Sequence, residues 1–241
     1  MELHFYHPEF EAEVRTQLGT FHRPVTEEDV MSATHLDLSN FDFLCEDMPT
    51  LSLFKNLKSL EINIRHTTPE FWHTFSHMEK LYVCLGDDFD FISFANMKKL
   101  SYLFVSGGDY SSIDFVNLDA LIPLKKLCEL QLHEFGSVDI LPLASMPQLR
   151  DFGILYANKV HNIDVIGTLS QLETLTLTGL YVDNLDFLDR LPDYIRLEMC
   201  GNHVYSGVDP QKWKRFSERD ICEISVSDKP YEHIDLSILA T

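Results

Sequence analysis

The chain has 241 residues, and 45% of them are hydrophobic, so it can bury a continuous core and does not have the composition of a disordered protein. Its 38 acidic and 19 basic residues give a formal net charge of −19. That charge disfavours binding to nucleic acid or to an anionic membrane and favours a basic protein partner. A solvated acidic surface without a specific target would have the same composition.

The cysteines predict neither a disulfide framework nor a zinc site. They are five in number, they are spread over the chain, and none forms a C-x-x-C pair. The first fifteen residues lack the pattern of a signal peptide, and no window approaches the roughly 18 consecutive apolar residues of a membrane span. We therefore expect a cytoplasmic protein, or an extracellular one if a signal peptide has been removed.

Residues 8–30 have a helical periodicity that the rest of the chain lacks. Phe10, Val14 and Leu18 recur at helical spacing, and Gly19 follows as a C-cap. Thr26 then precedes three acidic residues, which is the signature of a helix N-terminus. We expect two short helices in a cap over residues 1–32, because the first unit of a repeat array has no neighbour on one side.

From residue 33 a Leu-x-x-Leu-x-Leu frame recurs nine times, at intervals of 21 to 27 residues, which indicates an internal repeat. The frame positions are Ala33, Leu36, Leu38; Leu57, Leu60, Ile62; Met78, Leu81, Val83; Leu100, Leu103, Val105; Leu127, Leu130, Leu132; Leu149, Phe152, Ile154; Leu172, Leu175, Leu177; Tyr194, Leu197, Met199; and Ile221, Ile224, Val226.

The second half of each frame alternates, so it predicts a strand with its two aliphatic side chains inward. A later apolar cluster in each repeat would form the opposite wall; these clusters include Phe91 and Ile92, Phe115 and Val116, Ile140 and Leu141, Ile163 and Val165, and Phe187 and Leu188. One repeat cannot bury both walls alone. We therefore predict an α/β solenoid over residues 33–226, with a parallel sheet of about nine strands on its concave face. It would span roughly 40 Å and form one continuous domain with the cap.

Two intervals of 27 residues indicate insertions. Gly107 and Gly108 predict a protruding loop in the first. The second predicts a helix that begins after Asp209 and carries Trp213 and Phe216 on one face. Residues 227–241 would then close the stack as a C-terminal cap.

These repeats resemble the bacterial leucine-rich repeats of internalins. The resemblance rests on the strand frame and on Val138-Asp139-Ile140-Leu141-Pro142-Leu143, which is similar to the internalin I-x-D-I-x-P-L pattern. An aspartate recurs at that place as Asp90, Asp114, Asp139, Asp164 and Asp186, and residues 8–39 resemble the helical cap that precedes such repeats. The resemblance covers nearly the whole chain. It implies a curved right-handed stack and protein recognition through the concave face.

One departure from the internalin pattern concerns the turns after the strands. The family usually places an asparagine three residues after the last strand leucine, where stacked amides bond to the turn backbone. This chain has Phe41, Arg65, Phe135 and Leu180 at such places, and an asparagine only at Asn202. The turns must therefore satisfy their backbone groups in another way.

The outward positions of adjacent strands predict a candidate binding surface. Tyr82, Tyr102 and Phe104 would cluster there on an otherwise polar face, as interface anchors do. The expected partner-binding residues are Lys80, Tyr82, Tyr102, Phe104, Glu129, Gln131, His133 and Asp151. Alternatively, the loop that begins at Gly107 could fold over the rings and bury them.

Other candidate sites have weaker support. His73 and His77 have the spacing of two metal ligands on a helix, but no further ligand is near, and the aromatic residues around them indicate a packed helix instead. Lys212, Lys214 and Arg215 form the only basic cluster in the sequence, and we interpret it as a solvated helix face. No nucleophile elbow, P-loop or H-E-x-x-H motif occurs, so we expect no catalytic site, metal or cofactor.

We therefore expect a monomeric, non-enzymatic module that binds a protein, possibly a basic one, through its concave face. The alternative is a secreted or cell-surface adhesin of the internalin type whose leader has been removed.

Overall fold

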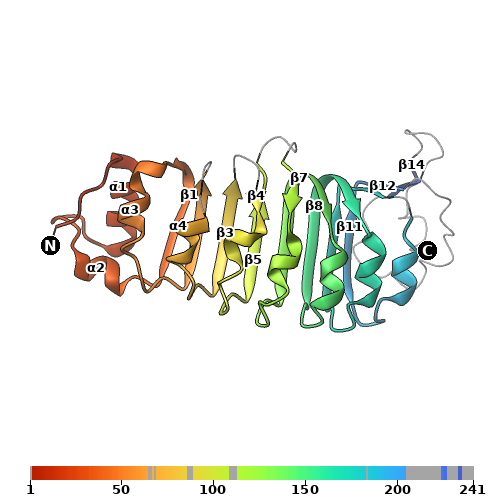
Figure 1. The fold of residues 1–241 in the computed structure, drawn as a ribbon. Coiled ribbons are helices and arrows are strands. Elements are labelled where there is room, and N and C mark those ends of the chain that lie inside the picture. Colours follow the sequence, from red (N-terminus) through yellow and green to blue (C-terminus); the bar gives the residue numbers. More distant parts are fainter. Residues whose placement is uncertain are drawn as a thin grey trace.

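A computed structural model describes residues 2–64, 67, 69–85, 89–108, 113–182, 184–204, 224–226 and 233–234. The molecule is elongated (Figure 1), with a row of strands along one side and short helices along the other. The expected helix near Trp213 and Phe216 and most of the expected cap over 227–241 lie outside the described residues.

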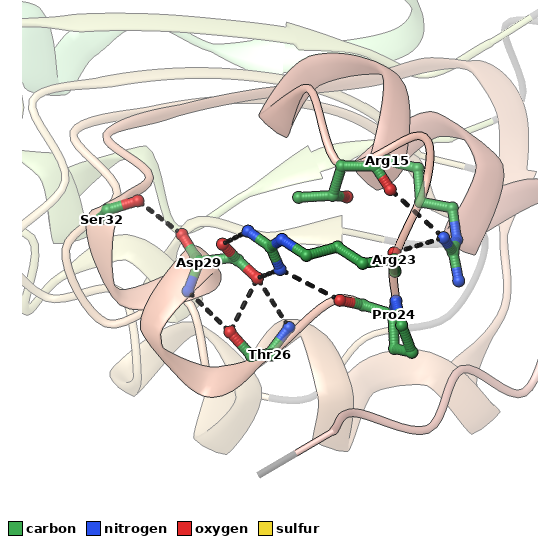
Figure 2. A network of polar contacts seen from close by, with 7 residues as sticks. Arg15, Arg23, Pro24, Thr26, Asp29 and Ser32 are labelled. Atoms are coloured by element: carbon green, nitrogen blue, oxygen red, sulfur yellow. Dashed lines mark hydrogen bonds and ion pairs between the residues drawn. The ribbon is translucent and has the colours of Figure 1, made fainter.

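The first end of the row is covered by α1 (Pro8–Leu18) and α2 (Glu27–Ser32), where the sequence predicts two helices. Gly19 ends α1 in the left-handed conformation, with φ 67°. Thr26 caps α2 in a capping box with Asp29, and Arg23 also binds the Asp29 carboxylate (Figure 2). The Arg23 guanidinium donates to both Asp29 carboxylate oxygens at 2.6 Å, and the Thr26 hydroxyl donates to Oδ2 at 2.7 Å. The charged form of Asp29 is therefore strongly favoured.

The main sheet follows sequence order, with parallel pairing between neighbouring strands along its path of eight. These strands are β1 (His35–Phe43), β2 (Ser59–Ile64), β3 (Lys80–Leu85), β5 (Tyr102–Ser106), β7 (Glu129–Asp139), β8 (Asp151–His161), β9 (Thr174–Thr178) and β11 (Arg196–Cys200). Both aliphatic positions of every strand are buried, from Leu36 and Leu38 in β1 to Leu197 and Met199 in β11. This confirms the inward columns of the first eight frames.

Short helices return the chain along the opposite wall: η1 (Cys45–Asp47), α3 (Met48–Leu51), α4 (Pro69–His73), η2 (Phe91–Phe94), η3 (Leu118–Leu121), η4 (Leu141–Ser145), η5 (Ile163–Thr168) and η6 (Asp186–Arg190). The two-residue strands β4 (Phe89–Asp90) and β6 (Phe115–Val116) join the main sheet at its side. Three residues expected in this wall, Ile92, Val116 and Leu141, are exposed instead. In each case an adjacent residue already fills the core (Phe91, Phe115 or Ile140), and the next side chain turns outward.

The prediction for the first position of the eighth frame is wrong. Tyr194 was expected to point inward, but its side chain is 65% exposed and Ile195 is buried in its stead. Ile195 makes the turn hydrogen bond of a first inward residue, from its N–H to the Pro192 carbonyl at 3.2 Å, as Leu172 does to the Leu169 carbonyl at 3.1 Å. The turn is therefore displaced by one residue, and Ile195 takes the inward place. The Tyr194 hydroxyl then donates to the Ser170 carbonyl at 3.1 Å on the outer surface.

The ninth frame does not extend the main sheet. Ile224 to Val226 form β13, which pairs with β12 (Asn202–Val204) and not with β11. A second sheet results, in the order β10 (Tyr181–Val182), β12, β13 and β14 (His233–Ile234). Along the described chain the main path has eight strands, and β4 and β6 bring the sheet to ten. The expected parallel sheet of about nine strands is therefore confirmed, while the ninth frame itself pairs with β12 instead of β11.

The turns after the strands use two different devices in place of an amide ladder. Asn202 is buried, accepts from the Leu180 N–H at 3.0 Å and donates to the Leu177 carbonyl at 2.7 Å. It makes the kind of bonds that the family's asparagine would make. Where that asparagine is absent, Phe135 is fully buried and stacks on Phe115 with ring centroids 4.6 Å apart. There, packing replaces hydrogen bonding.

Two of the recurrent aspartates start the return helices. Asp90 accepts from the Ile92 N–H at 2.8 Å, and Asp139 accepts from the Leu141 N–H at 2.9 Å. Each also accepts a side-chain amide from the next repeat: Asn117 donates to Asp90 at 2.9 Å, and Asn162 donates to Asp139 at 2.7 Å. The aspartate therefore ties neighbouring repeats together on the helical side.

We predict that Asp139→Ala lowers the free energy of unfolding by about 1 kcal/mol, because two backbone or amide donors lose their acceptor on an exposed edge. Chemical denaturation measures the change. Asp119→Ala is the matched control, since Asp119 is also exposed at a helix start and its side chain makes no hydrogen bond within the described chain. Equal effects of the two substitutions would contradict the role of Asp139.

The N-terminal cap should lose stability in acid. The hydrogen bond from Arg23, followed by that from Thr26, holds the pKa of Asp29 well below its usual value. The stabilisation is therefore complete above the unfolded-state pKa near about 4 and declines as the pH falls towards the lower folded-state pKa. Asp29→Ala should cost about 1 kcal/mol at neutral pH.

This difference between wild type and Asp29→Ala should shrink as the pH is lowered from about 6 to about 3. Denaturation at each pH provides the measurement. Glu27→Ala, in the same helix turn, should show a small difference at every pH. If the difference in free energy of unfolding between wild type and Asp29→Ala grows as the pH falls, the stabilising role of the Asp29 carboxylate is refuted.

Candidate functional site

The concave face is the side of the main sheet that points away from the short helices. Its first column runs in register from His35 through Ser59, Lys80, Tyr102, Glu129, Asp151 and Thr174 to Arg196, as the repeat frame predicts. Glu223, the last expected member, lies outside the described residues. The eight candidate partner-binding residues thus lie on the four adjacent strands β3, β5, β7 and β8.

Four of the candidates form one continuous group of rings. The Tyr82 and Tyr102 ring centroids are 4.5 Å apart, and those of Tyr82 and Phe104 are 5.9 Å apart. Phe104 in turn lies 4.4 Å from the His133 ring. All four side chains are neither buried nor fully exposed. The strand register therefore holds an apolar platform, open in part to solvent, across β3, β5 and β7.

Partial burial sets the ionisation of this platform. Burial, assisted by the Tyr82 hydroxyl, raises the pKa of Tyr102, and burial lowers the pKa of His133 despite the nearby Glu134 charge. These shifts favour the uncharged forms of Tyr102 and His133. Of the loop that could have covered them, Gly107 and Gly108 are described, and the Gly107 N–H donates to the His133 carbonyl at 2.9 Å. Residues 109–112 lie outside the described chain.

A polar group adjoins the platform on β7 and β8. The Gln131 side-chain amide donates to Asp151 Oδ1 at 2.6 Å, and Glu129 stands beside Asp151 in the strand register. Burial and the Glu129 charge raise the pKa of Asp151, while the hydrogen bonds from Gln131 and Thr174 act in the opposite direction. These carboxylates can accept hydrogen bonds from a basic or amide-bearing partner.

Gly153 makes this arrangement possible. A Cβ atom at Gly153 would lie 1.8 Å from Gln131 Oε1, in the space that the glutamine side chain occupies. The missing side chain lets Gln131 lie flat across the sheet and reach Asp151. In the repeat pattern this position is one of the outward positions, where a glycine has no other evident use.

The strand starts form a basic edge that the sequence analysis missed. The sequence predicts a single basic cluster, formed by Lys212, Lys214 and Arg215. Those residues lie outside the described chain. Exposed cations gather instead in the turns before β2, β5, β7 and β8 and at the first residue of β3, namely Lys55, Lys58, Lys80, Lys98, Lys99, Lys125, Lys126 and Arg150. Backbone hydrogen bonds link successive turns through Lys58, Glu79, Ser101, Cys128 and Arg150.

Few of these charges are neutralised locally. Lys58 pairs with Glu79 and Arg150 with Glu173, each at 3.4 Å, and within the described chain the other six cations of the edge form no ion pair. The sequence signal was present, since a Lys or Arg recurs one to five places before the middle leucine of five frames. It was missed because each repeat contributes only one or two of these cations, and the groups come together only when the repeats stack.

A second feature was also missed, in the middle of β7 and β8 and directly after β9 and β11. Glu134 and Tyr156 have positive φ values of 53° and 57°, and the corresponding residues in the next two repeats are Gly179 and Gly201. The signal for it was an aromatic residue and a glutamate at a place where later repeats carry glycine. Tyr156 and Tyr181 are both exposed.

The histidine pair does not form a shared helical site. The helix α4 ends at His73, so His77 lies beyond it, while Phe71, Trp72 and Phe75 are buried as expected for a packed segment. Among the described residues no group of three or more His, Cys, Asp or Glu side chains could hold a metal ion. Cys45, Cys84, Cys128 and Cys200 are not in disulfide bonds within the described chain. Within the same part of the chain no helix is sufficiently long and apolar to cross a bilayer.

No protein-family model and no curated protein matches the sequence. Solved structures do match. An internalin C2 from Listeria monocytogenes aligns with 91% of this chain and 93% of its own, with TM-score 0.57 and 18% identity. An internalin InlF from the same organism aligns with 92% of this chain and 77% of its own, with TM-score 0.53 and 17% identity.

The chain folds as a leucine-rich repeat solenoid. The internalin likeness expected from the repeats is confirmed as a likeness of fold, since these identities carry no more than that. The solenoid is not confined to internalins. The plant peptide hormone receptor RGFR1, solved in complex with RGF2, matches 80% of this solenoid over 34% of its own length, with TM-score 0.53 and 12% identity.

We predict that Gly153→Ala leaves the fold nearly unchanged and disrupts the polar group of the concave face. The new methyl meets only the end of a flexible side chain, so stability should change by less than about 1 kcal/mol. Gln131 must swing away, and Asp151 loses a hydrogen bond that favours its charged form. The pKa of Asp151, followed by carboxyl NMR, should therefore rise further. A fall in that pKa, or a large loss of stability, would show that Gly153 has another role.

Proposed function

We propose that this solenoid is a non-enzymatic protein-binding module and that its partner docks on the concave face. The observation that carries the proposal is the ring platform of Tyr82, Tyr102, Phe104 and His133 on an otherwise polar sheet. Exposed aromatic side chains surrounded by polar groups are typical of interface anchors, because they contribute large contact area at a small entropic cost.

The surroundings of the platform favour a partner of mixed character with basic groups. Glu129 and Asp151 flank the rings on one side and can accept from Arg or Lys side chains, while Lys80 borders them on the other. A net charge of −19 would attract a basic partner over distances of about a Debye length, roughly 10 Å at moderate salt. RGFR1, whose fold is similar, is known in complex with RGF2, which is consistent with such a role.

A capture experiment tests this proposal. Immobilised wild type and the double variant Tyr82→Ala with Phe104→Ala would be exposed to cell lysate at low and at high ionic strength. The double variant should lose most of the captured protein, because the centre of the platform is gone. Capture by wild type should weaken at high salt, because screening removes the electrostatic attraction.

The matched control is the double variant Phe21→Ala with Tyr194→Ala, which removes two exposed aromatic side chains away from the concave face. Retained capture by that control together with loss in the platform variant supports the concave site. Equal capture by both double variants would place the binding surface elsewhere. Capture that is insensitive to salt would remove the argument for a basic partner.

A further inference from the structure

One residue after the outward-facing part of four successive strands is left-handed. These residues are Glu134, Tyr156, Gly179 and Gly201, with φ between 53° and 64°. Glycine adopts this conformation freely, whereas other residues lose about 1–2 kcal/mol in it. Two adjacent repeats therefore keep a glutamate and a tyrosine where the fold itself favours glycine. Such strain is common where a side chain is needed for function.

The Tyr156 ring packs against a glycine of the next repeat. A Cβ atom at Gly179 would lie 2.6 Å from a ring carbon of Tyr156, so the glycine of the next repeat forms the floor on which the Tyr156 ring lies. The ring is nevertheless 55% exposed, and Tyr181, two residues beyond that floor, is 46% exposed. Together with Glu134, Asn158 and Gly108 these residues line one open hollow.

Glu134 brings an unmatched negative charge to this hollow. Its Oε2 atom accepts from the Ser106 hydroxyl at 2.8 Å, which fixes the carboxylate in place. Within the described residues it forms no ion pair, and its Oε1 atom accepts no hydrogen bond there. Glu134 thus lines the same hollow as two exposed aromatic rings, and a carboxylate together with aromatic rings is an arrangement that binds a guanidinium group. That cation is planar, stacks on aromatic faces and donates paired hydrogen bonds to carboxylates.

We propose that the hollow formed by Glu134, Tyr156 and Tyr181 binds an arginine side chain of the protein partner. The hollow adjoins the concave face, because Glu134 directly follows His133 of the ring platform. This inference extends the proposed function by naming a chemical group of the partner. It can be tested without that partner and without the four platform rings.

The experiment is an NMR titration with N-acetyl-arginine amide as the probe and N-acetyl-citrulline amide as the neutral control of the same shape. Tyrosine ring resonances would be followed in ¹³C-labelled protein, and those of Tyr156 and Tyr181 assigned by single Tyr→Phe changes. Arginine should shift both resonances and saturate, and citrulline should bind about tenfold more weakly because it lacks the charge. Citrulline binding as tightly as arginine, or shifts confined to Tyr82 and Tyr102, would overturn the proposal.

Two variants separate binding from folding. Glu134→Gln keeps an acceptor for Ser106 and removes the charge, so it should weaken arginine binding about tenfold with an unchanged amide spectrum. Tyr156→Gly removes both the ring and the backbone strain. It should abolish arginine binding without lowering the thermal midpoint, an outcome that a purely structural tyrosine would not give. Undiminished binding by Glu134→Gln refutes the proposal, whatever the stability of the second variant.

The proposed function can fail while this inference stands, and the reverse is also possible. Arginine binding that persists in the Tyr82→Ala, Phe104→Ala variant would show that the hollow acts independently of the platform. Loss of partner capture in that same variant would then still locate the main contact on the concave face.

Discussion

The stacking of paired aliphatic side chains between the sheet and the return helices governs the whole molecule. One repeat exposes both of its apolar walls, so each repeat is stable only against a neighbour. The stacking fixes the strand register, and the register fixes which residues face outward together. The ring platform, the basic edge and the left-handed row are all products of that register. Each of them joins residues of several repeats that lie far apart in the chain.

The polar contacts between repeats differ more from one repeat to the next than the apolar packing does. Asn202 bonds to the turn backbone as an internalin asparagine would, whereas Phe135 fills the corresponding place with a ring packed on Phe115. On the helical side, pairs such as Asp139 with Asn162 link adjacent repeats. The backbone groups of a solenoid turn need partners, but several chemistries supply them. This explains how the fold persists at 17–18% identity to the internalins.

The strand columns could be predicted from the sequence because alternation in a strand leaves only two choices for each side chain. The prediction failed where another constraint acted. A turn displaced by one residue puts Ile195 inward in place of Tyr194, and the ninth frame pairs with β12 and not with β11. The placement of the candidate site was likewise predictable, but its contacts were not. The hydrogen bond from Gln131 to Asp151 depends on the space above Gly153, and the position of the Tyr156 ring depends on Gly179 in another repeat.

The separation of charge across the width of the solenoid has a consequence for how it meets other molecules. Cations such as Lys99 and Lys126 line the starts of the strands, while exposed aspartates such as Asp139 and Asp164 lie at or beyond their ends. The described part of the molecule therefore has an uneven charge distribution across its width, in addition to the net negative charge of the chain. In the field of a charged partner it experiences a torque that turns one edge forward before any contact is made. The rotational search is narrowed in this way, and a larger share of collisions begins in one orientation.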